Sequence, residues 1–379
     1  MDWSLSEDEQ MIADSVRDFA TREVEPKARA LDREERWPAE LVERMAELGL
    51  MGMCVPSAYG GAGLSTLSYA LAIEAVAEAC ASTAVIMSVN NSLVCDPIVH
   101  YGTEAQKKAW LPGLASGGKL GCFGLTEPSS GSDAAHMDTV AQQDGGGWVL
   151  QGSKNWITNG PHADVMLVIA ATDRSLGSKG VSAFLVPTDN PGFKAQPRDE
   201  KLGIHAAHSC TVFFEQCRLP ADSLLGGVGQ GFKIAMHTLD GGRIGIAAQA
   251  IGIARAALRK ALDYSRERKA FGGVLADKQA IQFKLADMAT AIEAAHLLTL
   301  RAAWCKDQGG RHSLESATAK LMASEMATRV THQALQIFGG YGYSKEYDLE
   351  RHYRDARITE IYEGTSEIMR IVIAAAMLK

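Results

Sequence analysis

The sequence lacks the features that would direct it to a membrane, to secretion or to a nucleic acid. Its longest apolar runs, residues 165–171 and 371–378, are far shorter than the roughly 18 residues that a membrane-spanning helix requires. Residues 1–4 are acidic, and no apolar core follows them, so they do not resemble a signal peptide. Lysine and arginine total 38 against 45 for aspartate and glutamate, and the formal net charge is −7. Because nucleic acids and anionic membranes both need a basic face, we expect a cytoplasmic protein that binds neither.

Paired cysteines and the common catalytic motifs are also missing. The seven cysteines are an odd number without a C-x-x-C pair, which indicates reduced thiols. The chain has no G-x-G-x-x-G, G-x-x-x-x-G-K-[ST], H-E-x-x-H or G-x-S-x-G, so it has no signature of a Rossmann site, a P-loop, a zincin or a nucleophile elbow. His205 and His208 lie three apart beside Gly203, but a turn at a strand end explains them better than a metal site does. We therefore expect no metal.

What the chain does have is enough apolar material for a large core, arranged in three regions. Of its 379 residues 46% are hydrophobic, and a chain of this length buries most of its apolar surface without disulfides. Residues 1–120 have helical periodicity, residues 121–225 have the turns and β-branched runs of strands, and residues 226–379 have long alanine-rich helical patterns. The expected helices are 38–48, 64–79, 83–94, 103–111 (ended by Pro112), 232–268, 278–307, 313–338 and 366–378, with a further one opened by a capping box of Ser6 and Glu9. The expected strands are 148–150, 155–158, 165–171, 181–186 and 211–214.

Four segments contain more glycine, hydroxyl and aromatic residues than turns and helix ends need. They are residues 123–133, 156–160, 336–343 and 361–367. Each has a structural explanation when taken alone, such as a loop, a β-turn or a helix C-cap at Gly339. In the last segment Thr365 or Ser366 would cap the final helix, and Glu363 stands just before that N-terminus with no side chain at Gly364 beside it.

Together these segments resemble one family. Over essentially its full length the chain is similar to the acyl-CoA dehydrogenases, flavoproteins that desaturate fatty acyl thioesters between Cα and Cβ. The likeness is carried by residues 239–247 (LDGGRIGIA), 281–288 (IQFKLADM) and 351–365 (RHYRDARITEIYEGT), which look like the short-chain, butyryl-CoA branch. One family signature is met from Gln336 through Glu346 and Arg351 to Asp355. Another is met at residues 124–133, and His136 stands where the family usually has a small residue.

The resemblance implies an α+β fold and an FAD cofactor. The fold would comprise an N-terminal helical domain (1–120), a small middle β-barrel domain (121–225) and a C-terminal four-helix-bundle domain (226–379), assembled as a homotetramer in which neighbouring subunits complete each FAD site. The residues implied to hold the isoalloxazine ring are Phe123, Leu125, Thr126, Gly131, Ser132, Trp156, Ile157 and Thr158. Those implied to reach the cofactor from the partner subunit are Arg268, Phe271, Gln279, Gln336, Ile337, Gly339 and Gly340, with Thr365 and Glu367 as same-chain contacts. From the pattern alone, Arg268 would be explained as a solvated charge.

The same resemblance implies that Glu363 is the catalytic base. It would remove the α-proton while its backbone N–H helps to hold the thioester oxygen, and hydride would pass from Cβ to flavin N5. A water-poor site would raise the pKa of this carboxyl group toward the working pH. Some branches place the base just before the arginine equivalent to Arg243, but that residue is Gly242 here. The residues implied to contact the substrate are Ser132, Asp240, Arg243, Tyr362 and Gly364.

Asp96 departs from the family pattern, because short-chain members typically have glycine there. Two interpretations stay open. Asp96 would cap a helix that starts at Pro97, or it would place a carboxylate beside the acyl tail, where it binds polar chains or acts as a second base.

The sequence thus predicts a short-chain acyl-CoA dehydrogenase that passes electrons to electron-transferring flavoprotein. The same chemistry on a branched or alicyclic acyl-CoA, or a catalytically inactive relative with a binding role, remains as an alternative.

Overall fold

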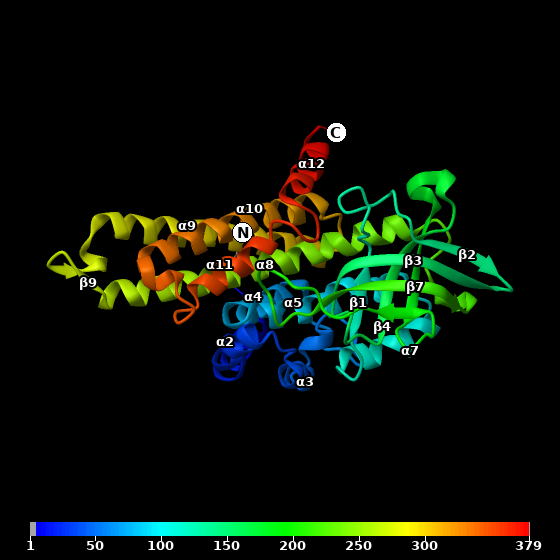
Figure 1. The fold of residues 1–379 in the computed structure, drawn as a ribbon, viewed down its shortest axis with the longest axis horizontal. Helices are drawn as coiled ribbons and strands as arrows, with labels where there is room; N and C mark the ends of the chain where they lie inside the picture. The colour runs from blue at the N-terminus through cyan, green and yellow to red at the C-terminus, as the bar shows by residue number, and fades with distance from the viewer. Residues whose placement is uncertain (1–4, 379) are drawn as a thin grey trace.

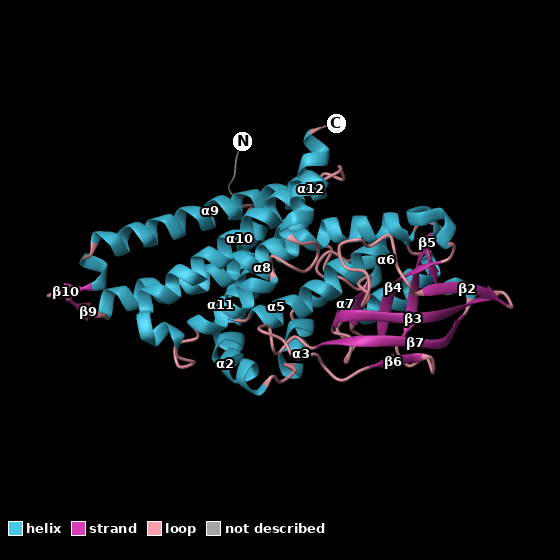
Figure 2. Ribbon diagram, turned by 45° about the horizontal axis from the view of Figure 1, so that its top comes forward, coloured by secondary structure: helices cyan, strands magenta, loops and turns pink. Residues whose placement is uncertain are grey.

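The computed structural model describes residues 5–378, so the prediction made for residues 1–4, that they do not resemble a signal peptide, falls outside the described residues. A helical part, a sheet and a second helical part follow one another along the chain (Figure 1). Figure 2 shows the sheet at one end of the long axis and the tip of the long helices at the other. Between residues 5 and 378, no helix is long and apolar enough to cross a membrane.

The first part consists of helices that follow the expected apolar periodicity. They are α1 (Glu7–Phe19), α2 (Glu25–Glu34), α3 (Ala39–Glu47), α4 (Thr66–Ala79), α5 (Ala81–Ser88), α6 (Asp96–Tyr101) and α7 (Glu104–Ala115). The predicted capping box of Ser6 and Glu9 opens α1. Pro112 does not end α7 as predicted, since the helix continues through it to Ala115. Leu111 and Leu114, on either side of the proline, are completely buried, so their packing outweighs the loss of one backbone hydrogen bond.

The helix predicted for residues 83–94 is longer than expected. α5 runs without interruption through a π-helical segment, Val89–Cys95, into α6. In the π turn the Asp96 N–H donates to the carbonyl of Asn91, five residues back, instead of the usual four. The side chain of Asn91 donates to the carbonyls of Leu50 and Met87, which fixes this segment in the core.

The middle part is a single eight-stranded sheet. Its strands are β1 (Gly121–Gly124), β2 (Val140–Asp144), β3 (Gly147–Thr158), β4 (Val165–Ala171), β5 (Val181–Pro187), β6 (Phe193–Ala195), β7 (Ser209–Leu219) and β8 (Leu224–Leu225), in the order β6-β7-β3-β2-β4-β5-β8, with β1 parallel to β4. The two strands predicted at 148–150 and 155–158 are both part of β3. Its register with β7 shifts between Leu150 and Gly152 and again between Lys154 and Ile157, which is why the alternation of the sequence breaks there.

Long helices form the third part. They are α8 (Gly231–Glu267), α9 (Gln279–Asp307), α10 (Ser313–Phe338), α11 (Leu349–Ile358) and α12 (Ser366–Met377). A small hairpin of β9 (Lys269–Ala270) and β10 (Gly273–Val274) connects α8 to α9 at the far end of the molecule (Figure 1). Buried alanines, among them Ala254, Ala302 and Ala323, let these helices approach closely. Neither α2, α11 nor the hairpin was predicted from the sequence.

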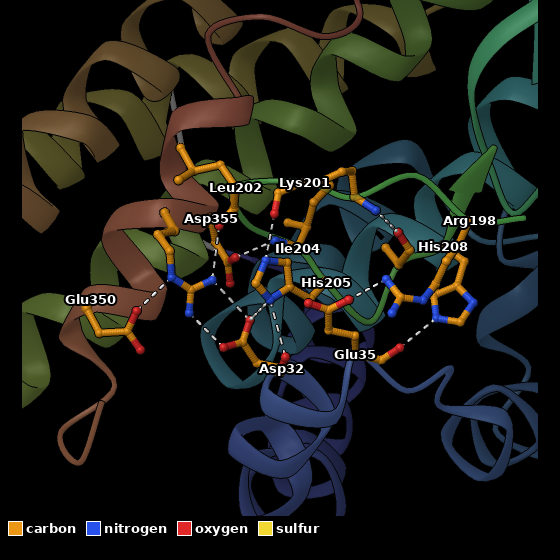
Figure 3. Close-up of polar contacts among 12 residues, drawn as sticks. Asp32, Glu35, Arg198, Lys201, Leu202, Ile204, His205, His208, Glu350 and Asp355 are labelled. Atoms are coloured by element: carbon orange, nitrogen blue, oxygen red, sulfur yellow. Dashed lines mark hydrogen bonds and ion pairs between the residues drawn. The ribbon is translucent and has the colours of Figure 1, made fainter. Parts of the chain in front are cut away.

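A polar cluster ties the three parts together (Figure 3). Asp32 of α2 accepts a hydrogen bond from Arg354 of α11 at 2.7 Å, and its carboxylate lies 3.1 Å from Nδ1 of His205 in the segment between β6 and β7. Next to it, the carboxylate of Asp355 accepts from the Ile204 N–H at 2.5 Å. The hydrogen bond to Asp32 raises the pKa of His205, and burial raises the pKa of Asp355 to about 6. Both ring nitrogens of His205 lie within hydrogen-bonding distance of a backbone carbonyl, Nδ1 of Asp32 and Nε2 of Lys201, so the ring has a structural role in this turn.

We expect Asp32→Asn to lower the free energy of unfolding by about 1–3 kcal/mol, because Arg354 and His205 lose the charge that both of them face. The matched control is Asp14→Asn. Asp14 also pairs with an arginine, Arg17, but both side chains are more than half exposed, so the change should stay within about 0.5 kcal/mol. Urea unfolding at pH 7 measures both. Equal losses of unfolding free energy in the two variants would show that Asp32 does not hold the three parts of the fold together.

Candidate functional site

The site is centred on Glu363, in the turn between α11 and α12. Glu363 has φ +53° and Gly364 has φ +101°, so two consecutive residues adopt left-handed conformations. Glycine is favoured at 364 because L side chains rarely adopt this φ; a Cβ there would also lie 2.6 Å from the Met369 Cε, the flexible end of that side chain. Thr365 then caps α12 by accepting from the Ile368 N–H at 3.3 Å, as one of the two predicted caps. A left-handed conformation in a non-glycine residue is strained and is typical of functional positions. Here the carboxylate of Glu363 points into the protein, where its Oε2 is buried.

The Glu363 carboxylate lies against α8 at Gly242. Its Oε2 atom is buried and has no hydrogen-bond partner among residues 5–378. A Cβ built on Gly242 would lie 2.1 Å from that atom and 2.8 Å from the Leu93 Cδ2. Any side chain at 242 would therefore displace the carboxylate. The glycine that removes the alternative base also provides the space that Glu363 occupies.

Burial makes the Glu363 carboxyl group a weaker acid, and two nearby cationic side chains reduce this effect. Burial raises the pKa of Glu363 to about 7, although Lys320 and Arg243 act in the opposite direction. Arg243 is held by Asp240 at 2.6 Å and directs its Nε toward the Glu363 carbonyl at 3.4 Å. A carboxyl group with a pKa near neutrality can both lose and gain a proton at the working pH.

Lys320 of α10 is a component of the site that was not predicted from the sequence. It is completely buried and donates to the Gly364 carbonyl at 2.6 Å. Burial lowers its own pKa to about 8. The available signal was a lysine on the apolar stripe of α10, four residues from the buried positions Ser316 and Ser324.

The structure excludes one of the two interpretations of Asp96: this residue is not a helix cap. Its backbone is helical in the continuous stretch from α5 to α6, so no helix begins at Pro97. Its Oδ1 accepts from Lys306 Nζ of α9 at 2.7 Å. Its Oδ2 is buried without a hydrogen-bond partner in the described part of the chain.

The two segments predicted to hold a flavin ring, the loop after β1 and the end of β3, contact each other. The Asn155 N–H donates to the Thr126 carbonyl at 2.9 Å, which joins the loop after β1 to β3. Beneath them a buried ion pair of Lys154 and Glu127 at 2.6 Å fixes the loop, and Lys154 also donates to the Leu125 carbonyl. Trp156, at the second register shift, has φ +61° and remains 61% exposed, so its ring offers a free face. Phe123, Gly131, Ser132, Ile157 and Thr158 belong to these same two segments.

The residues predicted to contact the cofactor from a partner lie elsewhere. Arg268 and Phe271 are on the β9–β10 hairpin, at the opposite end of the long axis from β3 (Figure 1). Arg268 lies over the Tyr341 ring at 5.5 Å, and Phe271 is 95% exposed. Gln336, Ile337, Gly339 and Gly340 end α10, with Gly339 as the predicted C-cap, and Gln279 begins α9. One chain therefore does not bring the two predicted halves of the cofactor site together.

The local chemistry of both halves fits FAD. A Cβ at Gly131, Gly339 or Gly340 would meet nothing within 4 Å, so the backbone there is open to a ligand. The exposed Trp156 ring can cover a flat aromatic system. In the first turn of α12 the Ser366 hydroxyl is buried without a hydrogen-bond partner in the described chain, beside the predicted contacts Thr365 and Glu367.

Comparisons with known proteins show which proteins this chain is similar to. Residues 6–118, 122–217 and 229–378 match the profiles for the N-terminal, middle and C-terminal domains of acyl-CoA dehydrogenase. The mitochondrial short-chain specific acyl-CoA dehydrogenase of Bos taurus is 56% identical over 99% of this chain and 91% of its own length. The butyryl-CoA dehydrogenase structure from Megasphaera elsdenii superimposes with a TM-score of 0.98 at 45% identity, covering both chains completely. A structure described as "Electron transferring flavoprotein of Acidaminococcus fermentans: Towards a mechanism of flavin-based electron bifurcation" gives a TM-score of 0.99 at 47% identity, also over both full chains.

Proposed function

The chain belongs to the acyl-CoA dehydrogenase family, and on that premise we propose that Glu363 is the base that removes the α-proton of its substrate. The protein is an FAD-dependent oxidoreductase of the short-chain branch, which desaturates short acyl-CoA thioesters. One observation supports the assignment of the base above all others. The Oε2 atom of Glu363 is buried and has no hydrogen-bond partner in the described chain. This burial raises the pKa of the carboxyl group to about 7.

Proton removal from a thioester α-carbon needs a positioned base and a dry site. Glu363 accepts the proton on its carboxylate, and the surroundings that exclude water keep it basic at neutral pH. Arg243 and Lys320 hold the carbonyls of Glu363 and Gly364, which fixes the strained turn and with it the direction of the carboxylate. We assign the Glu363 N–H to the thioester oxygen, where charge develops as the proton leaves. Bound FAD supplies the acceptor for the hydride from Cβ.

Anaerobic titration of the purified holoenzyme with butyryl-CoA tests this function directly. The visible absorbance of the flavin should bleach as substrate is added. A flavoprotein that binds acyl-CoA without bleaching would instead be an inactive relative with a binding role. Branched and alicyclic acyl-CoA thioesters in the same assay measure the alternative substrate classes.

We also propose a homotetramer in which the hairpin end of one chain completes the FAD site of another. The separation of the two predicted halves within one chain supports this. So does the exposure of Phe271 on the hairpin, which leaves its ring free to contact a partner subunit. Sedimentation should give a tetramer with one FAD per chain, and a monomer that retains FAD would contradict the shared site.

Arg268→Ala should weaken FAD retention by about 10-fold or more, because a charge-assisted hydrogen bond to phosphate is lost. Arg266→Ala is the control. Arg266 is 70% exposed, and its ion pair with Asp263 is long, at 3.9 Å, and therefore weak. The flavin-to-protein ratio after gel filtration measures both. Equal retention in the two variants would exclude Arg268 from the cofactor site.

We further infer that electron-transferring flavoprotein is the acceptor and that the protein acts in the cytoplasm. The acceptor is supported by the family and by the similarity to the structure from Acidaminococcus fermentans. Replacing the dye acceptor with purified electron-transferring flavoprotein in a turnover assay tests the first inference.

A further inference from the structure

The turn at the end of β3 contains a side chain that does more than close the turn. The Gly160 N–H donates to the Ile157 carbonyl at 3.0 Å, and Asn159 between them has φ +69°, which is typical of asparagine in a β-turn. The side chain of Asn159 is completely buried. Its amide nitrogen donates to the Ile86 carbonyl in α5 and to the Gly121 carbonyl at the start of β1, both at 3.2 Å. A turn alone explains the backbone of Asn159 but not these two hydrogen bonds.

The helix that Asn159 reaches packs against α8. Ser88, two residues beyond Ile86 in α5, forms a hydrogen bond with the Tyr69 hydroxyl at 2.9 Å. A Cβ built on Gly245 of α8 would lie 2.5 Å from each of these two hydroxyl oxygens. At Gly245, α8 is therefore in direct contact with the Ser88 side of α5.

The same continuous helix contacts α8 a second time, beside the proposed base. Leu93, in the π-helical continuation of α5, lies with Glu363 against Gly242. Gly242 and Gly245 are three residues apart, so they share one face of α8 and are about 4.5 Å apart along its axis. One helix thus contacts the α8 face on which the Glu363 carboxylate lies, and also accepts a hydrogen bond from the end of β3.

The other strand that is predicted to hold the flavin ring is fixed to this helix as well. The Gly121 N–H at the start of β1 donates to Oδ1 of Asn90 at 2.9 Å. Asn90 lies in the π-helical segment, and its own amide nitrogen donates to the Met51 carbonyl at 2.8 Å and the Leu114 carbonyl at 3.2 Å. Asn90 therefore holds β1 to the helix, and Asn159 holds β3 to it.

We propose that Asn159 is a positioning residue for the reaction: it fixes the end of β3 to α5 and thereby sets the distance between the flavin ring and the Glu363 carboxylate. This inference rests on the proposed function, because it takes residues 156–158 as flavin contacts and Glu363 as the base. The substrate gives its α-proton to Glu363 and its β-hydride to bound FAD, so both groups must be in place at the same time. A displacement of about 1 Å caused by a residue outside the reacting groups costs on the order of 100-fold in rate.

Asn159→Gly tests the proposal in the holoenzyme, since glycine adopts the left-handed turn without strain and removes only the side-chain amide. Stopped-flow reduction of the flavin by butyryl-CoA should slow by about 100-fold. The Kd for butyryl-CoA should stay at the wild-type value, because the turn at Glu363 is not changed.

The matched control is Gln106→Ala. Gln106 of α7 is also a buried amide, and its nitrogen donates to the carbonyls of Asp222 at 2.7 Å and Leu224 at 3.0 Å. It therefore also joins a helix to the β part through two hydrogen bonds, but at β8, which pairs with β5 and with neither β1 nor β3. This variant should reduce its flavin at close to the wild-type rate.

A ligand that cannot be oxidised separates positioning from general stability. Acetoacetyl-CoA has no hydrogen on Cβ, so it transfers no hydride, but it loses an α-proton to form an enolate. An enolate stacked on an oxidised flavin gives a long-wavelength charge-transfer band, whose intensity depends on how the two planes overlap. Asn159→Gly should bind acetoacetyl-CoA and lose most of this band, whereas Gln106→Ala should keep it. Asn159→Asp, which keeps the size of the side chain and replaces the N–H donors with oxygen, should lose the band as well.

Three results would overturn the proposal. They are a wild-type band in a folded Asn159→Gly or Asn159→Asp enzyme, slower reduction with an unchanged band, and equal loss of the band in Gln106→Ala. The last would show that any weakened contact between a helix and the β part has this effect. Failure of every acyl-CoA to reduce the wild-type flavin would instead contradict the proposed function.

Discussion

Glu363→Gln should retain FAD and still bind acyl-CoA, but should lose flavin reduction by butyryl-CoA by about 10⁴-fold or more. A positioned general base contributes roughly 10²–10⁴-fold, and the loss is larger where no other base can replace it. No second base adjoins this carboxylate on α8, since the neighbouring position is Gly242. Glutamine keeps the shape of the side chain, so the strained turn and the N-cap at Thr365 should be preserved. Anaerobic stopped-flow reduction measures the rate of the chemical step directly.

The matched control is Glu360→Gln, in the same turn. The Glu360 carboxylate pairs with Arg357 at 2.7 Å rather than entering the pocket of Glu363, so its variant should reduce at close to the wild-type rate. Rapid flavin reduction in Glu363→Gln would remove Glu363 from the catalytic role. Loss of FAD from that variant would show that the glutamate is structural.

Much of the fold could be predicted from the sequence because its long helices carry their own apolar period. The prediction for residues 313–338 agrees with α10 at both ends. Predictions failed where packing overrode a local rule. Pro112 lies within a helix because the leucines beside it are buried, and β3 was divided in two because its register shifts hide the alternation.

Asp96 and Lys320 show the same limit in the site. An aspartate before proline is a common helix N-cap, yet Asp96 pairs with Lys306, which is 210 residues away in sequence. Lys320 lies against the turn at Gly364, 44 residues further on. Neither contact leaves a pattern in the local sequence, because each depends on how α8, α9 and α10 pack. Glu363 was identified from motif order, but its buried Oε2, which gives it the raised pKa, becomes visible only when Gly242 is placed beside it.

Replacing Lys320 should move the pH dependence of the reaction. With Glu363 as the proposed base, the reaction needs its ionised form; burial raises its pKa to about 7, so kcat/KM of the wild type should fall as the pH drops through about 7. The Lys320 ammonium lowers that pKa, because it favours the charged form of the base. In Lys320→Met this attraction is lost, the pKa of Glu363 rises further, and the acid limb moves to higher pH. At pH 6 the rate should be about 10- to 100-fold below the wild type, the consequence of a shift of about one to two pH units.

A purely structural role for Lys320 predicts a different result. Its hydrogen bond to the Gly364 carbonyl also holds the turn, and loss of that contact alone would lower the rate by the same factor at every pH. The charge effect, in contrast, should disappear above the new pKa of the base, where Glu363 is ionised in both enzymes. Lys284→Met is the control, since Lys284 is only partly buried and its ammonium contacts Gln333 on α10. A pH profile of Lys320→Met that is parallel to the wild type would show that the lysine acts through the turn. A profile that converges with the wild type at high pH would show that its charge keeps the buried base ionised near neutral pH.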